Sequence, residues 1–182
     1  MKKLLLISTI LLTSTICFGQ SKPLLFSDVI KSDSTDKATL FATINDWFAT
    51  NYKSLSDVIQ MVDKDAGILI AKGAFKYYKK GFRYECYNGF VDYTIKVYVK
   101  DNRYKVIITD FRHSVKSGGQ KFCSLGLITT AQSYVRNKHN NKQDTVVWNE
   151  IKVKAEEYSN QIFKSFNEKT NEQNKPLIND DW

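Results

Sequence analysis

The sequence contains few residues that break regular secondary structure: two prolines and eight glycines among 182 residues. This scarcity excludes a collagen-like chain and argues against a disordered or low-complexity one. Hydrophobic residues make up 42% of the chain and aromatic residues 13%, which is enough material for a core. The length and composition together predict one folded domain.

Histidine and cysteine are also scarce, with two and three copies. Neither His113 nor His139 has another histidine or a cysteine three or four residues away, so the spacing predicts no metal site. The chain has no glycine-rich phosphate loop, no His-Glu-x-x-His pair, no Gly-x-Ser-x-Gly elbow and no Cys-x-x-Cys. We therefore expect no metal, no cofactor and none of the common catalytic templates.

The one long run of apolar and weakly polar residues lies at the N-terminus, from 4 to 18, behind two lysines. It is shorter than the roughly 20 residues that cross a bilayer. With the small Gly19 after it, the run predicts a cleaved signal peptide over residues 1–19. Ile16 is too bulky to precede a lipid-modified Cys17, which argues against a lipoprotein. We expect an exported protein, periplasmic or secreted, with no membrane span after cleavage.

The net charge of +8 results from 27 Lys and Arg against 19 Asp and Glu. A basic chain can bind nucleic acid, but such a partner is scarce outside the cytoplasm. The predicted export therefore favours an envelope protein or polymer as partner over a nucleic acid.

Hydrophobic periodicity predicts a strand at 24–31 and an amphipathic helix at 36–52 with Ser34 or Thr35 as N-cap. Two β-rich runs, 58–62 and 68–75, flank a turn rich in Asp and Gly and predict a hairpin. Residues 76–89 either extend a strand or form an aromatic loop.

The clearest pattern is the alternation between Gly89 and His113, which predicts a second hairpin turning at Asp101–Asn102. A two-residue turn pairs Val99 with Tyr104, and every second pair onward is apolar. The opposite face of this hairpin is mixed and would leave large apolar area in water unless the loop at 114–143, the tail or a partner covers it. In the last case it forms a binding face. Its residues are Lys96, Tyr98, Lys105, Ile107 and Phe111.

Residues from about 114 to 143 are predicted to be a connecting loop. A second amphipathic helix is expected from Asp144 or Thr145 to about Thr170, and residues 173–182 are expected to form a tail. The helical aromatic positions are interpreted as core, not as a ligand cage. They are Trp47, Phe48, Trp148, Tyr158 and Phe166.

The order strand, helix, four strands, helix predicts an α+β domain over residues 20–172, with both helices on one face of an antiparallel sheet. The strand at 26–30, the helix centred on Trp47, the turn into 68–73 and the hairpin at 93–108 resemble a family of exported bacterial proteins. This family is a domain of unknown function with a TBP-like fold. The resemblance implies that fold but brings no catalytic residues, and the loop at 114–143 departs from it.

Two cysteines, Cys86 and Cys123, remain after removal of the signal peptide. In an oxidising compartment they either pair as a disulfide or stay as two buried thiols. We expect a non-enzymatic binding or scaffolding domain of the bacterial envelope. The alternative is an envelope hydrolase that uses Cys123 as a thiol nucleophile beside His113 or His139.

Overall fold

The structure is a computed structural model that describes residues 21–115, 121–135 and 141–173. The predicted signal peptide, residues 1–19, lies outside these residues, and so do His139 and residues 174–182 of the predicted tail. None of the helices among the described residues is long and apolar enough to span a membrane.

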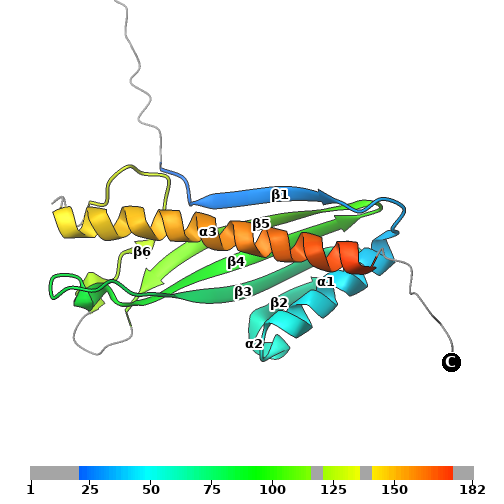
Figure 1. Cartoon of the computed structure of the whole chain (residues 1–182), viewed down its shortest axis with the longest axis horizontal. Helices are drawn as coiled ribbons and strands as arrows, with labels where there is room; N and C mark the ends of the chain where they lie inside the picture. The colour runs from blue at the N-terminus through cyan, green and yellow to red at the C-terminus, as the bar shows by residue number, and fades with distance from the viewer. Residues whose placement is uncertain (1–20, 116–120, 136–140, 174–182) are drawn as a thin grey trace, which may run out of the picture.

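An antiparallel sheet forms the centre of the molecule (Figure 1). Its five main strands lie side by side in the order β1-β5-β4-β3-β2, and a short sixth strand, β6, pairs with β5. The strands are β1 (Leu25–Lys31), β2 (Ile59–Asp63), β3 (Ile68–Tyr77), β4 (Gly89–Lys100), β5 (Arg103–Ser114) and β6 (Gly126–Leu127).

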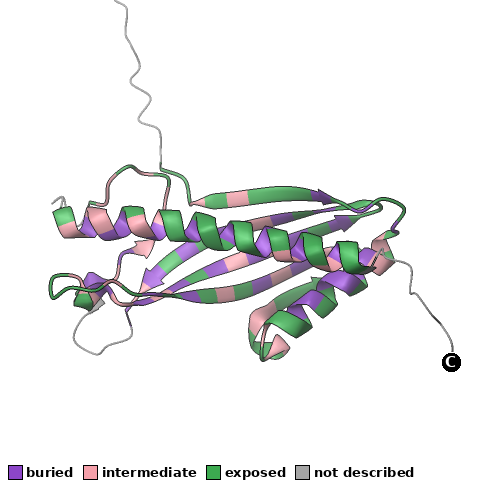
Figure 2. Cartoon of the chain, viewed as in Figure 1, coloured by how far each residue is buried: buried purple, intermediate pink, exposed green. Residues whose placement is uncertain are grey.

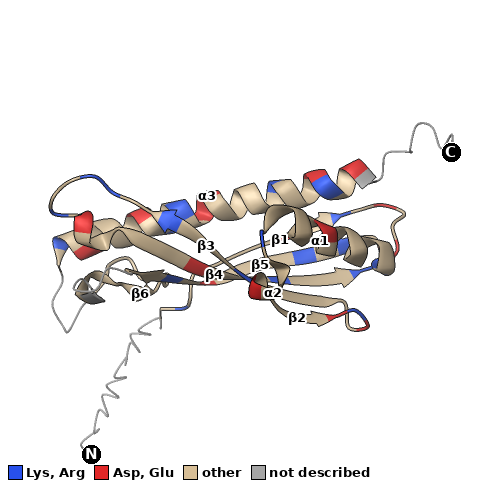
Figure 3. Cartoon of the chain, turned by 90° about the horizontal axis from the view of Figure 1, so that it is seen from below, with Lys and Arg blue, Asp and Glu red and all other residues tan. Residues whose placement is uncertain are grey.

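Two helices, α1 (Lys37–Asn51) and α3 (Lys142–Gln173), cover one face of this sheet (Figures 1 and 3). A short helix, α2 (Leu55–Val58), leads into β2, and 3-10 turns span Glu85–Tyr87 and Lys121–Cys123. The predicted α+β class, with an antiparallel sheet under two helices, is confirmed.

Helix α1 begins one residue later than expected because Asp36 is its N-cap. The Asp36 carboxylate accepts a hydrogen bond from the Thr39 backbone N–H at 2.9 Å. The prediction of Ser34 or Thr35 is wrong: Ser34 has a φ of 60° in the preceding turn, and the Thr35 hydroxyl is bonded to Ser32. The predicted apolar stripe of this helix is buried.

Helix α3 spans 32 residues and is longer at both ends than expected. Its predicted inward positions are buried with one exception, because Tyr158 is 40% exposed. The helices meet where Trp47 stacks on Phe166 with ring centroids 3.9 Å apart. Burial of these rings stabilises the packing of α1 against α3.

The hairpin of β4 and β5 has the predicted register from the turn inward. Val99 pairs with Tyr104 and Ile95 with Ile108, and all four side chains are buried. Figure 2 shows the resulting alternation of buried and exposed residues along the strands. This alternation is the physical origin of a core face and an opposite face on the same sheet.

Two segments for which the sequence predicted a loop or left a loop open, residues 76–89 and 114–143, contain some regular structure. Strand β3 continues to Tyr77 and is followed by a loop with a 3-10 turn, so both alternatives for 76–89 hold in part. Most of the described part of the predicted connecting loop at 114–143 lies outside helices and strands, as expected, but β6 pairs with β5 and the side chains of Leu125 and Ile128 are buried in the core. Apolar burial holds this segment in place.

Candidate functional site

The candidate site is the sheet face that points away from α1 and α3, which we call the open face. In Figure 3, α3 lies above the sheet and no helix of the described residues lies below it. Register places the open-face side chains in rows across the strands. One row is Val29, Lys105, Tyr98, Ile68 and Asp63.

Large apolar side chains on the open face are in contact with solvent. Leu25 and Val29 on β1 are 53% and 52% exposed, Met61 on β2 is 44% exposed, and Tyr98 on β4 is 38% exposed. Ile107 is half-buried between them. Exposed apolar area that spans neighbouring strands is typical of an interaction surface.

The open face is also basic. Eight of its residues carry a positive charge and three carry a negative charge. The basic residues are Lys31, Lys72, Lys76, Lys96, Lys100, Arg103, Lys105 and Arg112, and the acidic ones are Asp63, Asp92 and Asp110. The helices differ: α1 holds one lysine and one aspartate, and α3 holds five lysines and six acidic residues. Among the described residues, positive charge is therefore in excess on the open face.

Four of the five residues predicted for the binding face lie together on the open face. Tyr98 pairs with Lys105, and Lys96 pairs with Ile107 in the next row. Sequence reasoning considered only one hairpin and missed the basic residues of β1 and β3. The sheet order brings those strands alongside, and that order is not visible in a local pattern.

Phe111 is the exception, and its predicted position on the binding face is wrong. It is fully buried and packs on the core face, 5.8 Å from the ring of Phe26 and 5.9 Å from that of Tyr93. The register shifts between Asp92 and Thr94, so that Asp92 pairs with Arg112 instead of Phe111. Asp110, with a φ of 58°, supplies the extra residue of this β-bulge.

The described part of the connector does not cover the open face. Ala131 lies against α3, because its carbonyl oxygen accepts hydrogen bonds from Trp148 Nε1 at 3.2 Å and from Lys152 Nζ at 2.9 Å. The ring of Tyr134 packs 5.1 Å from that of Trp148. Residues 121–135 thus close the core on the helix side.

Cys86 and Cys123 form a disulfide in the structure, with their Cα atoms 5.8 Å apart. The bond joins the turn before β4 to the turn after β5. Cys123 is also buried, with 2% of its surface exposed. The alternative mechanism needs an accessible thiolate at Cys123, and this arrangement does not provide one.

His113 is buried beside the disulfide and serves the fold. Its Nδ1 accepts from the Leu125 backbone N–H at 3.2 Å, so Nε2 carries the proton and donates to the Tyr87 carbonyl at 2.9 Å. Burial lowers the pKa of His113 and keeps the ring neutral. Both ring nitrogens are thus hydrogen-bonded to the backbone, one at Tyr87 next to Cys86 and the other at Leu125 near Cys123.

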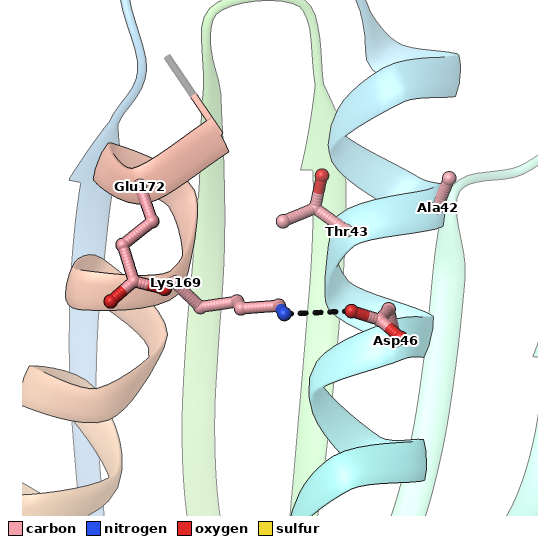
Figure 4. A pocket seen from close by; sticks show the side chains of 5 residues that line it. All are labelled: Ala42, Thr43, Asp46, Lys169 and Glu172. Atoms are coloured by element: carbon pink, nitrogen blue, oxygen red, sulfur yellow. Dashed lines mark ion pairs between the residues drawn. The ribbon is translucent and has the colours of Figure 1, made fainter. Parts of the chain in front are cut away.

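A groove of about 440 Å³ lies between the two helices and is bridged by an ion pair (Figure 4). Lys169 Nζ is 2.7 Å from Asp46 Oδ2, and this contact raises the pKa of Lys169. The pair links α3 to α1 across the surface, so the groove is a packing feature of the helices. Among the described residues, no group of three His, Cys, Asp or Glu side chains could hold a metal ion.

Comparison with known proteins identifies the fold. Residues 26–114 match a domain of unknown function (DUF4468) with TBP-like fold. A TBP-like protein from Parabacteroides distasonis is 16% identical with a TM-score of 0.53, over 79% of this chain and 92% of that one. A DUF4468 family protein from Bacteroides ovatus is 15% identical with a TM-score of 0.51, over 79% and 86% of the two chains. No curated protein matches the chain.

Proposed function

Because residues 26–114 belong to the DUF4468 family, whose TBP-like fold this chain shares, we propose that the open face of its sheet is the functional surface. The protein acts as a non-enzymatic binding or scaffolding domain of the bacterial envelope. It is exported by its N-terminal signal segment, and its partner is an envelope protein or polymer that carries negative charge.

The observation that carries this proposal is the joint presence of exposed apolar groups and positive charge on one uncovered face. Tyr98 and Val29 stand on either side of Lys105 in one row. Apolar contact supplies affinity when such a surface is buried, and the lysines attract an acidic partner and fix its orientation. A surface this broad suits a macromolecule better than a small substrate.

The test compares two triple variants as baits in envelope extract. The first changes the open face by Lys96→Glu, Tyr98→Ala and Lys105→Glu. The control makes the same kinds of change on the exposed side of α3 by Lys154→Glu, Val153→Ala and Lys164→Glu. Phe111 is left unchanged because its side chain belongs to the core.

We expect the wild type and the α3 variant to retain the same partner and the open-face variant to lose it. A rising salt concentration should release the partner from the bait, because screening weakens the attraction between exposed charges. An open-face variant that keeps every partner of the wild type would overturn the proposal.

A further inference from the structure

A second surface feature lies at the free edge of strand β3 and reaches from the helix side of the sheet to the open face. The pairing of β2 with β3 ends at Ile59 and Ala71, so no described strand pairs with β3 on that side beyond Ala71. Helix α1 ends at Asn51 and leaves this part of the sheet to α3 alone. Two clefts of about 500 and 560 Å³ occupy the space.

Tyrosine side chains form the walls where the clefts meet. Both clefts are lined by Tyr52, Ala74 and Tyr93. The ring of Tyr93 lies across Gly73, where a Cβ atom would come within 2.5 Å of the ring. The absence of a side chain at Gly73 thus sets the position of Tyr93, whose hydroxyl lies 3.3 Å from that of Tyr52.

Tyr158 provides an exposed aromatic surface in the first cleft. It stacks on Phe75 with ring centroids 4.7 Å apart and an interplanar angle of 21°, yet remains 40% exposed. A ring held on one side by a buried neighbour and exposed elsewhere is a rigid platform for a flat apolar surface. Helical spacing alone would assign this residue to the core.

The polar groups around this platform are hydroxyls and amides. Asn51 and Gln161 line the same cleft as Tyr158, and Lys53 is its one charged lining residue. Burial raises the pKa of Tyr93 and of Tyr52, so both hydroxyls stay protonated at neutral pH. Hydroxyl and amide groups both donate and accept hydrogen bonds, which matches a ligand rich in hydroxyls.

We propose that these two clefts bind an oligosaccharide, with one sugar ring stacked on Tyr158 and its hydroxyl groups bonded to Gln161, Asn51 and the tyrosine hydroxyls. A sugar ring combines an apolar face with a rim of hydroxyls, as this lining requires. The second cleft continues past Tyr52 and Tyr93 around the edge of β3 to four charged open-face residues, so a chain of more than one sugar fits the paired clefts. These residues are Lys72, Asp92, Asp110 and Arg112. The two clefts contain neither Tyr98 nor Lys105.

The test is calorimetric titration of the purified protein with three neutral trisaccharides, of glucose, of mannose and of N-acetylglucosamine, up to about 10 mM to cover weak complexes. Adenosine serves as a probe for a flat aromatic ligand instead. We expect at least one trisaccharide to bind. Tyr158→Ala should weaken that binding about tenfold through loss of stacking.

Gln161→Ala is the second variant, because its side chain is exposed and its loss should leave the fold intact. We expect it to weaken binding several-fold through lost hydrogen bonds. Tyr98→Ala, an exposed aromatic on the other face, should leave saccharide affinity unchanged.

The proposal is overturned if no trisaccharide binds, if adenosine binds in their place, or if the Tyr158 and Gln161 variants both bind as the wild type does. None of these results bears on the partner of the open face, whose loss is measured with the Lys96, Tyr98 and Lys105 variant.

Discussion

The two faces of the sheet are built from alternate residues of the same strands, yet they have opposite chemistry. On β4, Val91, Ile95 and Val97 are fully buried under the helices, while Lys96 and Tyr98, which alternate with buried residues, reach solvent. The core face is apolar because the helices exclude water from it. The open face combines apolar and positively charged groups, and no helix of the described residues covers it, which is the composition of an interaction surface.

The bulge at Asp110 decides on which face of the sheet Phe111 lies, and this placement has the largest expected effect on stability. Phe111→Ala tests this, because the bulge turns Phe111 to the core face, whereas regular pairing would leave it opposite Asp92 on the open face. We expect a loss of about 3–5 kcal/mol in the free energy of unfolding, since the substitution leaves a cavity in the core. Chemical denaturation of the variant measures it. A loss below about 1 kcal/mol would show that Phe111 does not lie in the core.

Substitutions at two neighbouring residues of β4 compare the core face with the open face. Ile95→Ala leaves a cavity beneath the helices and should cost about 2–5 kcal/mol. Lys96→Ala removes a side chain that points to the uncovered side and should change stability by less than about 0.5 kcal/mol. Urea denaturation of both variants tests this. Equal losses in the free energy of unfolding would show that Ile95 and Lys96 do not lie on a buried and an exposed face.

His113 allows a milder test through pH. Burial lowers the pKa of His113 below its ordinary value of 6.5, so its contribution to stability is present above about pH 6.5 and is lost as the pH falls. The charged ring would also place a proton on Nδ1 against the Leu125 N–H. We expect the free energy of unfolding to decrease from about pH 6.5 to about pH 5 in the wild type.

His113→Gln is the control for that titration, because glutamine has similar polarity but no ionisation in this range. Its unfolding free energy should be lower at neutral pH and flatter between about pH 6.5 and 5. The same slope in both proteins would assign the effect to other groups.

Sequence reasoning succeeded where a local rule determines structure. A two-residue turn at Asp101–Asn102 determined the register near the turn, and helical spacing located most of the buried positions of α1 and α3. It failed at Asp110, because an aspartate in an exposed strand position carries no mark of a bulge. It also failed at Tyr158, since periodicity identifies the inward side of a helix but not whether another element covers each position.

The candidate site was predicted only in part for the same reason. Tyr98 and Lys105 share a hairpin whose register can be deduced, so their placement could be anticipated. Lys31 and Lys72 come from strands that join the face through the order β1-β5-β4-β3.

Site-specific photo-crosslinking in the producing cell tests most directly whether the open face is where the protein binds. A photoreactive phenylalanine analogue replaces Tyr98 on the open face or Val153 on the outer side of α3, two exposed apolar positions on opposite sides of the molecule. If the open face is the binding surface, we expect a specific adduct from position 98 and none from position 153. An adduct from position 153 with none from position 98 would contradict it.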